Sequence, residues 1–182
     1  STSTATQQRQ QRLQRYIENI NAATNQYRAA YRVGASDATS LRQIGEHLMA
    51  VGDYEGAAQA YMRLTERNTE DRAGYERLAQ AYIPLARYEQ AQAAARRAID
   101  LGNGYNPTAI VTLGDIARLR NQPEQATQQY NAALEQNPDQ GSAYIGLGRL
   151  AADAGNWSVA AAHFQRGIVH ESGSAEAHYW LA

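Results

Sequence analysis

The chain has 182 residues, of which 17 are basic and 18 are acidic, and its formal net charge is −1. This balance gives no overall attraction to nucleic acid or to an anionic membrane surface, and neither is predicted as a partner. Every basic residue is an arginine and cysteine is absent, which excludes disulfides and leaves anion contacts to guanidinium groups. No apolar run approaches the roughly 20 residues of a membrane span, so direct membrane insertion is not expected.

The chain opens on a segment expected to be a linker, Ser1–Thr6. Apolar residues then recur every three or four positions, which predicts one long amphipathic helix over about Thr6–Val33. These residues are Leu13, Tyr16, Ile17, Ile20, Ala23, Tyr27, Ala30 and Tyr31. The alternative for residues 7–37 is a degenerate repeat, because the stripe also matches the period described next. Gly34 is expected to end the helix, and Ser36 or Asp37 to cap the following one.

Four alanines set that period. Ala57, Ala91, Ala126 and Ala160 are separated by 34, 35 and 34 residues. A fixed period in the thirties indicates stacked helical repeats rather than a globule. The predicted units are 38–71, 72–106, 107–140 and 141–174, followed by a partial fifth unit at 175–182.

Each unit is expected to hold two helices, with a break near its positions 15 and 16. The breaks fall at Gly52-Asp53, Ala86-Arg87, Asn121-Gln122 and Gly155-Asn156. Glycine and asparagine tolerate the left-handed backbone that ends a helix, and Pro107 and Pro123 can each begin one. Position 8 of each unit is a small residue, namely Gly45, Ala79, Gly114 or Gly148. We interpret it as facing one of the four alanines, which stand at position 20, where the two helices come closest.

The second unit is expected to be the least regular. It holds one extra residue, and Gly102–Gly104 is interpreted as a loose joint. Pro84 removes a backbone donor late in the first helix, so we expect that helix to end early.

These features resemble the tetratricopeptide repeat (TPR) family over residues 38–182. The fourth unit carries the pattern in Tyr144, Leu147, Gly148, Trp157, Ala160, Phe164 and Gly167. The resemblance implies an all-α fold, namely a right-handed α-solenoid of antiparallel helix pairs, here with a long N-terminal helix.

The family also implies a concave groove lined by the first helix of each unit. Carried over by register, the groove candidates are Arg42, Glu46, Met49, Glu76, Gln80, Ile83, Val111, Asp115, Arg118, Ile145, Arg149 and Tyr179. An extended peptide or a partner helix with an acidic group would suit the two arginines of the later units. Glu46 stands where the carboxylate-clamp subtype of the family carries asparagine, which argues against that subtype.

No catalytic motif, phosphate loop or metal-ligand pattern is present. His163, His170 and His178 are near the C-terminus, and packing positions explain them better than a metal site does. The sequence therefore predicts no enzyme activity, no cofactor and no metal.

The predicted function is a non-catalytic protein–protein interaction scaffold that binds a protein or peptide partner. One alternative is self-assembly as a homo-oligomer through residues 175–182, where Tyr179, Trp180 and Leu181 begin an incomplete unit. Another is a regulatory TPR region of a larger enzyme or secretion component. The sequence assigns no compartment. It favours the cytoplasm slightly, with export or anchoring through upstream sequence as the alternative.

Overall fold

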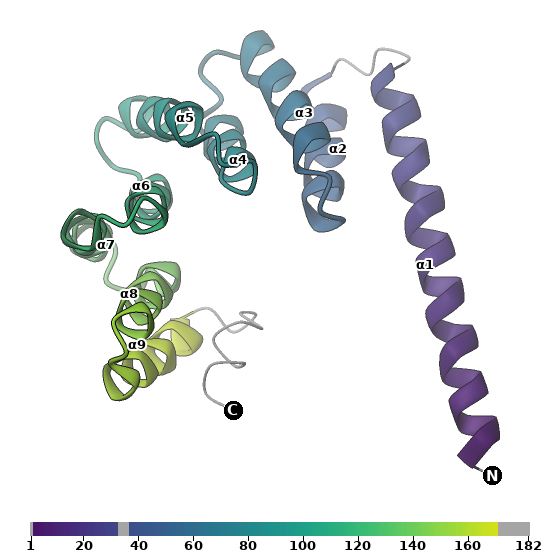
Figure 1. Ribbon diagram of the computed structural model, residues 1–182. Coiled ribbons are helices and arrows are strands. Elements are labelled where there is room, and N and C mark those ends of the chain that lie inside the picture. Colours follow the sequence, from purple (N-terminus) through teal and green to yellow (C-terminus); the bar gives the residue numbers. More distant parts are fainter. Residues whose placement is uncertain (1, 33–36, 171–182) are drawn as a thin grey trace. The chain divides into compact units, whose positions relative to one another are not determined.

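In a computed structural model, residues 2–32 and 37–170 are described. They form nine α-helices and no strand (Figure 1). The helices are α1 (Thr2–Arg32), α2 (Ala38–Ala50), α3 (Tyr54–Arg67), α4 (Arg72–Tyr82), α5 (Tyr88–Leu101), α6 (Pro107–Leu119), α7 (Pro123–Gln136), α8 (Gly141–Asp153) and α9 (Trp157–His170). The chain divides into two compact units, Ser1–Thr69 and Glu70–Ala182. Each unit is treated by itself below.

The first unit contains α1, α2 and α3. The prediction of one long N-terminal helix is confirmed, because α1 is uninterrupted. The segment expected to be a linker, Ser1–Thr6, is helical from Thr2 onward. No glycine or proline interrupts that segment, so the helix extends through it.

The C-terminal half of α1 packs on the α2–α3 pair. The Thr24 hydroxyl lies 3.1 Å from Nε2 of His47, and the Tyr27 ring stacks on the same imidazole with centroids 4.4 Å apart. Arg28 donates two hydrogen bonds to Asp53, which also caps α3 at the Gly56 N–H. Asp37, one of the two capping residues that the sequence predicts, caps α2 by accepting from the Ser40 N–H.

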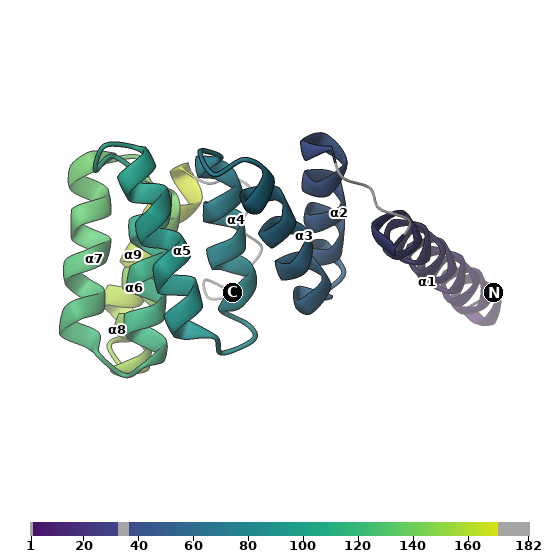
Figure 2. The same cartoon turned by 90° about the horizontal axis from the view of Figure 1, so that it is seen from above.

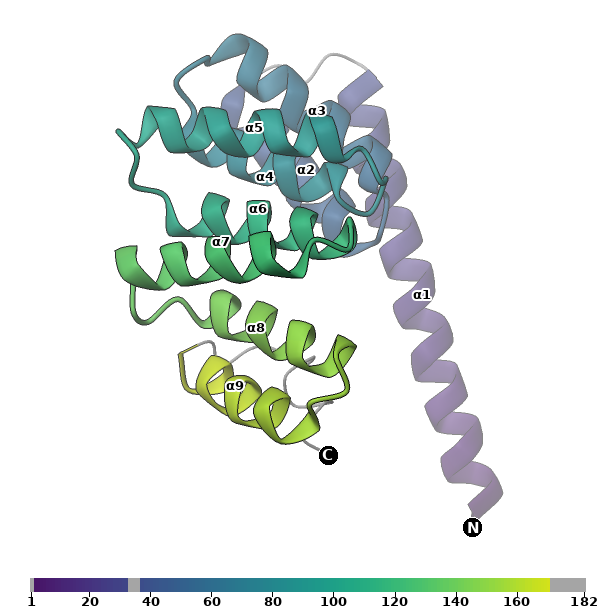
Figure 3. The same ribbon diagram turned by 60° about the vertical axis from the view of Figure 1, so that its left-hand side comes forward.

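The second unit contains three helix pairs, α4–α5, α6–α7 and α8–α9, stacked in succession (Figures 2 and 3). The first helices also pack on one another, α4 on α6 and α6 on α8, whereas α5, α7 and α9 have at most marginal contact among themselves. Helices that approach on one side and spread on the other produce curvature. Within this unit α4, α6 and α8 therefore lie on the inner side and α5 and α7 on the outer side (Figure 1).

The predicted breaks within the pairs are confirmed. Gly52, Ala86, Asn121 and Gly155 all have left-handed backbone, with φ of 78°, 55°, 58° and 77°. Pro84 has the predicted effect, because α4 ends at Tyr82 after 11 residues while α6 and α8 each run for 13. Pro107 and Pro123 begin α6 and α7.

The small residues at position 8 have a different cause from the predicted one. A Cβ on Gly114 would lie 2.6 Å from the Tyr130 ring, and one on Gly148 would lie 2.6 Å from the Phe164 ring. The nearest atoms therefore belong to the aromatic ring at position 24 of the same unit, and not to the alanine at position 20. Gly45 stands in the same relation to Tyr61. Glycine is required where this ring covers the first helix.

The joint after α5 is irregular but is not loose, contrary to the sequence-based interpretation. Asn106 is 3% exposed and caps α6 by accepting from the Ala109 N–H. Its side-chain amide donates to Glu76 at 2.7 Å and to the Ala98 carbonyl, and its backbone N–H donates to Gln136. One buried asparagine thus links α4, α5, α6 and α7, because buried polar groups require partners.

Candidate functional site: the inner face of the second unit

Partly buried charged side chains follow the inner helices of the second unit. Glu76 on α4, Asp115 and Arg118 on α6, and Arg149 on α8 have side chains that are 20%, 23%, 19% and 27% exposed. Gln80 and Ile83 at the end of α4 are half-buried as well. Charges in such positions are only partly screened by water, so they interact more strongly than fully solvated ones.

Two reciprocal ion pairs join α6 to α8. Arg149 Nη1 on α8 lies 3.7 Å from Asp115 Oδ1 on α6, and Arg118 Nη1 on α6 lies 3.0 Å from Asp153 Oδ2 on α8. We call these four residues the inner charge cluster. Asp153 is its most solvated member, with a side chain that is 60% exposed. The Nε atom of Arg118 is buried and has no hydrogen-bond partner among the described residues.

Tyr130 on α7 contacts this cluster through Asp115. It reaches from α7 across Gly114, and its hydroxyl donates a 2.7 Å hydrogen bond to Asp115 Oδ1. Burial, followed by the negative charge of Asp115, raises the pKa of Tyr130 far above its usual range, against the smaller opposing effect of Arg118 and Arg149. The phenol therefore remains a proton donor at every physiological pH. Asp115 is held in place by this donor on one side and by Arg149 on the other.

Protein-family models match most of this chain. One tetratricopeptide repeat model matches residues 12–73 and 111–176, and a second matches residues 73–101. The chain belongs to the tetratricopeptide repeat family. Members of the TPR family are generally protein-interaction scaffolds, and the fold is typically non-catalytic.

Several solved structures share this fold at low sequence identity. The thermophilic TPR protein TTC0263 of Thermus thermophilus superimposes with a TM-score of 0.71 at 18% identity, covering 92% of this chain and 91% of that one. YrrB, described as a TPR protein with an unusual peptide-binding site, gives 0.53 at 22% identity, covering 85% and 79%. MamA of Desulfovibrio magneticus RS-1 (residues 41 to the end) gives 0.61 at 18% identity, covering 90% and 93%.

A curated relative is the BBSome complex member BBS4 of Bos taurus. It is 26% identical over 134 residues, which are 74% of this chain. The chain spans only a quarter of the length of that relative.

Two groove candidates carried over from the TPR register lie inside the core. Val111 and Ile145 are 6% and 5% exposed. Val111 belongs to the cluster around Tyr130, and Ile145 belongs to the one around Phe164, with its Cγ1 2.7 Å from where a Cβ on Gly167 would lie. Both therefore stabilise the fold and offer little surface. Their apolar character is the signal that could have separated them from Arg42 and Glu76 at the same register position.

The remaining candidates are distributed as follows. Glu76 accepts from Asn106 and lies near Arg72, and Gln80 accepts from Arg77. Arg42 and Met49 are half-buried on α2 of the first unit, and Glu46 is exposed there. Tyr179 and the whole segment 175–182 lie outside the described residues. Sequence reasoning missed Asp153 and Tyr130, which complete the inner charge cluster and its support.

No group of three or more histidine, cysteine, aspartate or glutamate side chains converges as a metal site in the described part of the chain. His163 and His170 instead stack on Tyr144, with centroids 6.5 and 5.9 Å apart. Within residues 2–32 and 37–170, no helix has both the length and the apolar character needed to cross a bilayer.

Proposed function

We propose that this protein is a non-catalytic interaction scaffold that binds a peptide or a partner helix on the inner face of its second unit. The observation that carries the proposal is the inner charge cluster, where ion pairs between the inner helices α6 and α8 hold three charged side chains at 19–27% exposure. Such a cluster is already ordered and partly desolvated, so a partner gains from it without a large further ordering cost.

The geometry suggests how an acidic partner binds. Arg118 is largely buried, but its partner Asp153 is mostly solvated and contributes one contact. A carboxylate of the partner replaces Asp153 on the Arg118 guanidinium, and Asp153 moves into solvent at little cost. Asp153 thus occupies the position of the partner's acid in the free protein. Arg149 strengthens the attraction, and Asp115 limits it to a single acidic group.

The similarity to a BBSome complex member and to the structure of the Cut9–Hcn1 hetero-tetramer of APC/C supports a role in assembly. The Cut9–Hcn1 structure superimposes with a TM-score of 0.70 at 14% identity, covering 91% of this chain and 33% of that one. YrrB supports a peptide as the bound form.

The experiment uses two substitutions with opposite expected effects. Arg118→Gln removes the charge that receives the partner's acid, and binding should weaken by about tenfold. Asp153→Asn removes the competing carboxylate, and binding should strengthen. Partners captured by the wild-type chain from a lysate of its source are identified by mass spectrometry, and the affinity of each variant for those partners is then measured. Glu135→Gln, an exposed change on α7, is the matched control.

Equal capture by the wild type, Arg118→Gln and Asp153→Asn would disprove the proposal. A loss of binding in both variants would also contradict it, because Asp153 would then contribute to binding rather than compete with the partner.

A further inference from the structure

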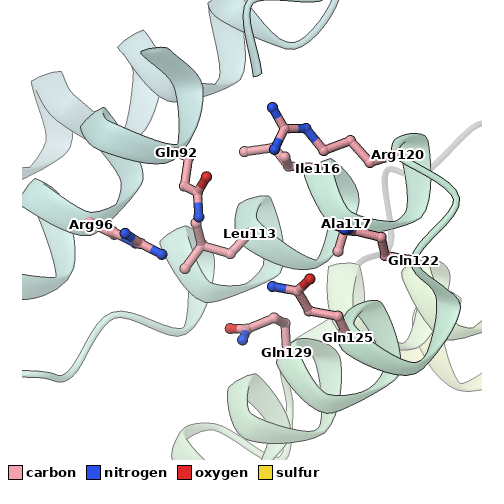
Figure 4. A pocket seen from close by; sticks show the side chains of 9 residues that line it. All are labelled: Gln92, Arg96, Leu113, Ile116, Ala117, Arg120, Gln122, Gln125 and Gln129. Carbon is pink, nitrogen blue, oxygen red and sulfur yellow. The ribbon is translucent and has the colours of Figure 1, made fainter. Parts of the chain in front are cut away.

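The outer side of the second unit holds a cavity of about 150 Å³ between α5 and α7, with α6 as its floor. Its lining residues, which define the back pocket, are Gln92, Arg96, Leu113, Ile116, Ala117, Arg120, Gln122, Gln125 and Gln129 (Figure 4). The cavity exists because α5 and α7 spread apart over α6. It lies on the opposite side of α6 from the inner charge cluster.

The size of the back pocket restricts its ligand. At roughly 30 Å³ per water molecule, its volume corresponds to about five waters. Small-molecule and cofactor sites have volumes of about 300–1,000 Å³, so the back pocket is too small for a nucleotide or a comparable cofactor. It has the size for one side chain of a partner.

Its chemistry selects the kind of side chain. Arg96 forms no ion pair or hydrogen bond with any residue that the structure describes, and the side-chain amides of Gln92, Gln125 and Gln129 are equally without partners there. Arg120 is fixed by Glu89 and lies 5.6 Å from the Tyr88 ring centroid. The floor is apolar, with Ile116 and Ala117 each 3% exposed. Two guanidinium groups, one of them already neutralised, leave a net positive charge of one.

The two arginines are specific to this joint of the array. One repeat later, where α7 and α9 flank α8, the residue that corresponds to Arg96 is Asn131 and the residue that corresponds to Arg120 is Ala154. The cations are therefore not required by the stacking of helix pairs, which proceeds at the next joint without them.

We propose that the back pocket binds a glutamate or aspartate side chain of a partner protein. The carboxylate is held by Arg96 and Arg120, the glutamine amides donate further hydrogen bonds, and an adjacent apolar residue of the partner covers Leu113 and Ile116. This gives the protein a second protein-binding site, separate from the inner face. Charge-assisted hydrogen bonds to a planar carboxylate are the strongest contacts that guanidinium groups form.

The test uses the capped pentapeptide Ala-Leu-Glu-Leu-Ala as the probe, with its glutamate replaced by glutamine as the matched ligand. Binding to the full chain is followed by NMR through the side-chain N–H signals of Gln92, Gln125 and Gln129 and of Arg96 and Arg120. The glutamate peptide should shift these signals and should bind about tenfold more tightly than the glutamine peptide, because only the former provides a charged acceptor. Inorganic phosphate should shift them less.

The variant Arg96→Asn/Arg120→Ala installs the residues of the next joint and should abolish binding while the chain remains folded. Arg97→Asn is the control, since Arg97 adjoins Arg96 but lies over the Tyr75 ring on the other side of α5. Arg118→Gln should leave peptide binding intact, which separates this proposal from the one above.

Equal affinity for the glutamate and glutamine peptides would overturn the proposal. Stronger binding of phosphate than of the glutamate peptide, or shifts confined to α4, α6 and α8, would do the same.

Discussion

In two helix pairs of the second unit, the glycine at position 8 of the repeat lies on the first helix and contacts the aromatic ring at position 24 on the second helix. Gly114 faces Tyr130 and Gly148 faces Phe164, whereas the α4–α5 pair has Ala79 and Ala95 at the same two positions. A methyl group is thus present on the first helix where the second helix carries no ring. The two positions compensate each other in volume, as close packing of a protein interior requires.

A double-mutant cycle tests this compensation. Gly114→Ala should lower the free energy of unfolding by about 1–3 kcal/mol, because its Cβ would overlap the Tyr130 ring. Tyr130→Ala should cost about 3–5 kcal/mol through the cavity that it leaves. In the double variant the alanine at position 114 has no ring to overlap. The double variant should therefore lose less stability than the sum of the two single losses. Additive losses in urea titrations would contradict the assignment.

His163 gives the protein a predicted pH dependence. Burial, followed by the charge of Arg166, lowers the pKa of His163, and its buried Nδ1 has no partner in the described residues. The unfolded chain therefore takes up a proton near its ordinary pKa of about 6.5, where the folded chain does not. The sign is that the free energy of unfolding falls as the pH drops through that value.

The measurement is the free energy of unfolding of the wild type and of His163→Gln between about pH 7.5 and pH 5, a range that spans the ordinary histidine pKa. The wild type should lose more stability than the variant over this range. Parallel profiles would show that His163 does not cause the loss. The comparison is needed because other groups titrate in the same range.

At the scale of elements, Asn106 joins four helices: its side chain contacts α4, α5 and α6, and its backbone N–H donates to Gln136 at the end of α7. Asn106→Ala should lower the free energy of unfolding by about 2–3 kcal/mol, because it removes the cap of α6 and leaves Glu76 without its amide donor. Asp37→Ala at the exposed cap of α2 is the comparison and should cost about 1 kcal/mol. Equal losses in thermal or urea unfolding would show that Asn106 acts as an ordinary cap.

Local sequence signals predicted the elements well because their causes are local. Pro84 shortens α4, and the residues at position 15 end the first helices, whatever surrounds them. The role of Asn106 depends on four helices that meet only in the folded chain. The burial of Ile145 depends on Gly167 in the next helix, and no spacing rule includes that contact.

The candidate site was predicted in part for the same reason. Register placed Asp115, Arg118 and Arg149 on the inner helices, where the structure has them, but it could not predict that they pair with one another. Asp153 was missed because it follows the register positions that define the groove. Pairing across helices is set by the rotation and spacing of α6 and α8, which a single repeat unit does not determine.

At the scale of the whole molecule, the second unit has separate apolar clusters rather than one core. One surrounds Tyr130 between α6, α7 and α8, and another surrounds Phe164 between α8 and α9. In arrays of this kind each helix pair interacts only with its neighbours. The destabilising effect of a substitution should therefore decrease with distance from the substituted pair.

Phe164→Ala tests this behaviour. The cavity should cost about 3–5 kcal/mol, and the loss should be local. Amide hydrogen exchange should accelerate most in α8 and α9, less in α6 and α7, and least in α4 and α5. Uniform acceleration across α4–α9 would instead show that the unit unfolds as a single cooperative body.

The ring of Tyr130 also determines how this chain can be rearranged. It covers Gly114 in its own pair, and a Cβ on Gly146 of α8 would lie only 2.4 Å from it. Anyone who transplants α6–α7 into another array must therefore supply a glycine at the sixth position of the helix that follows. The sixth residue of α6 itself is Thr112, not glycine. Two consecutive copies of α6–α7 would clash at their joint, whereas α6–α7 followed by α8–α9 is a compatible order.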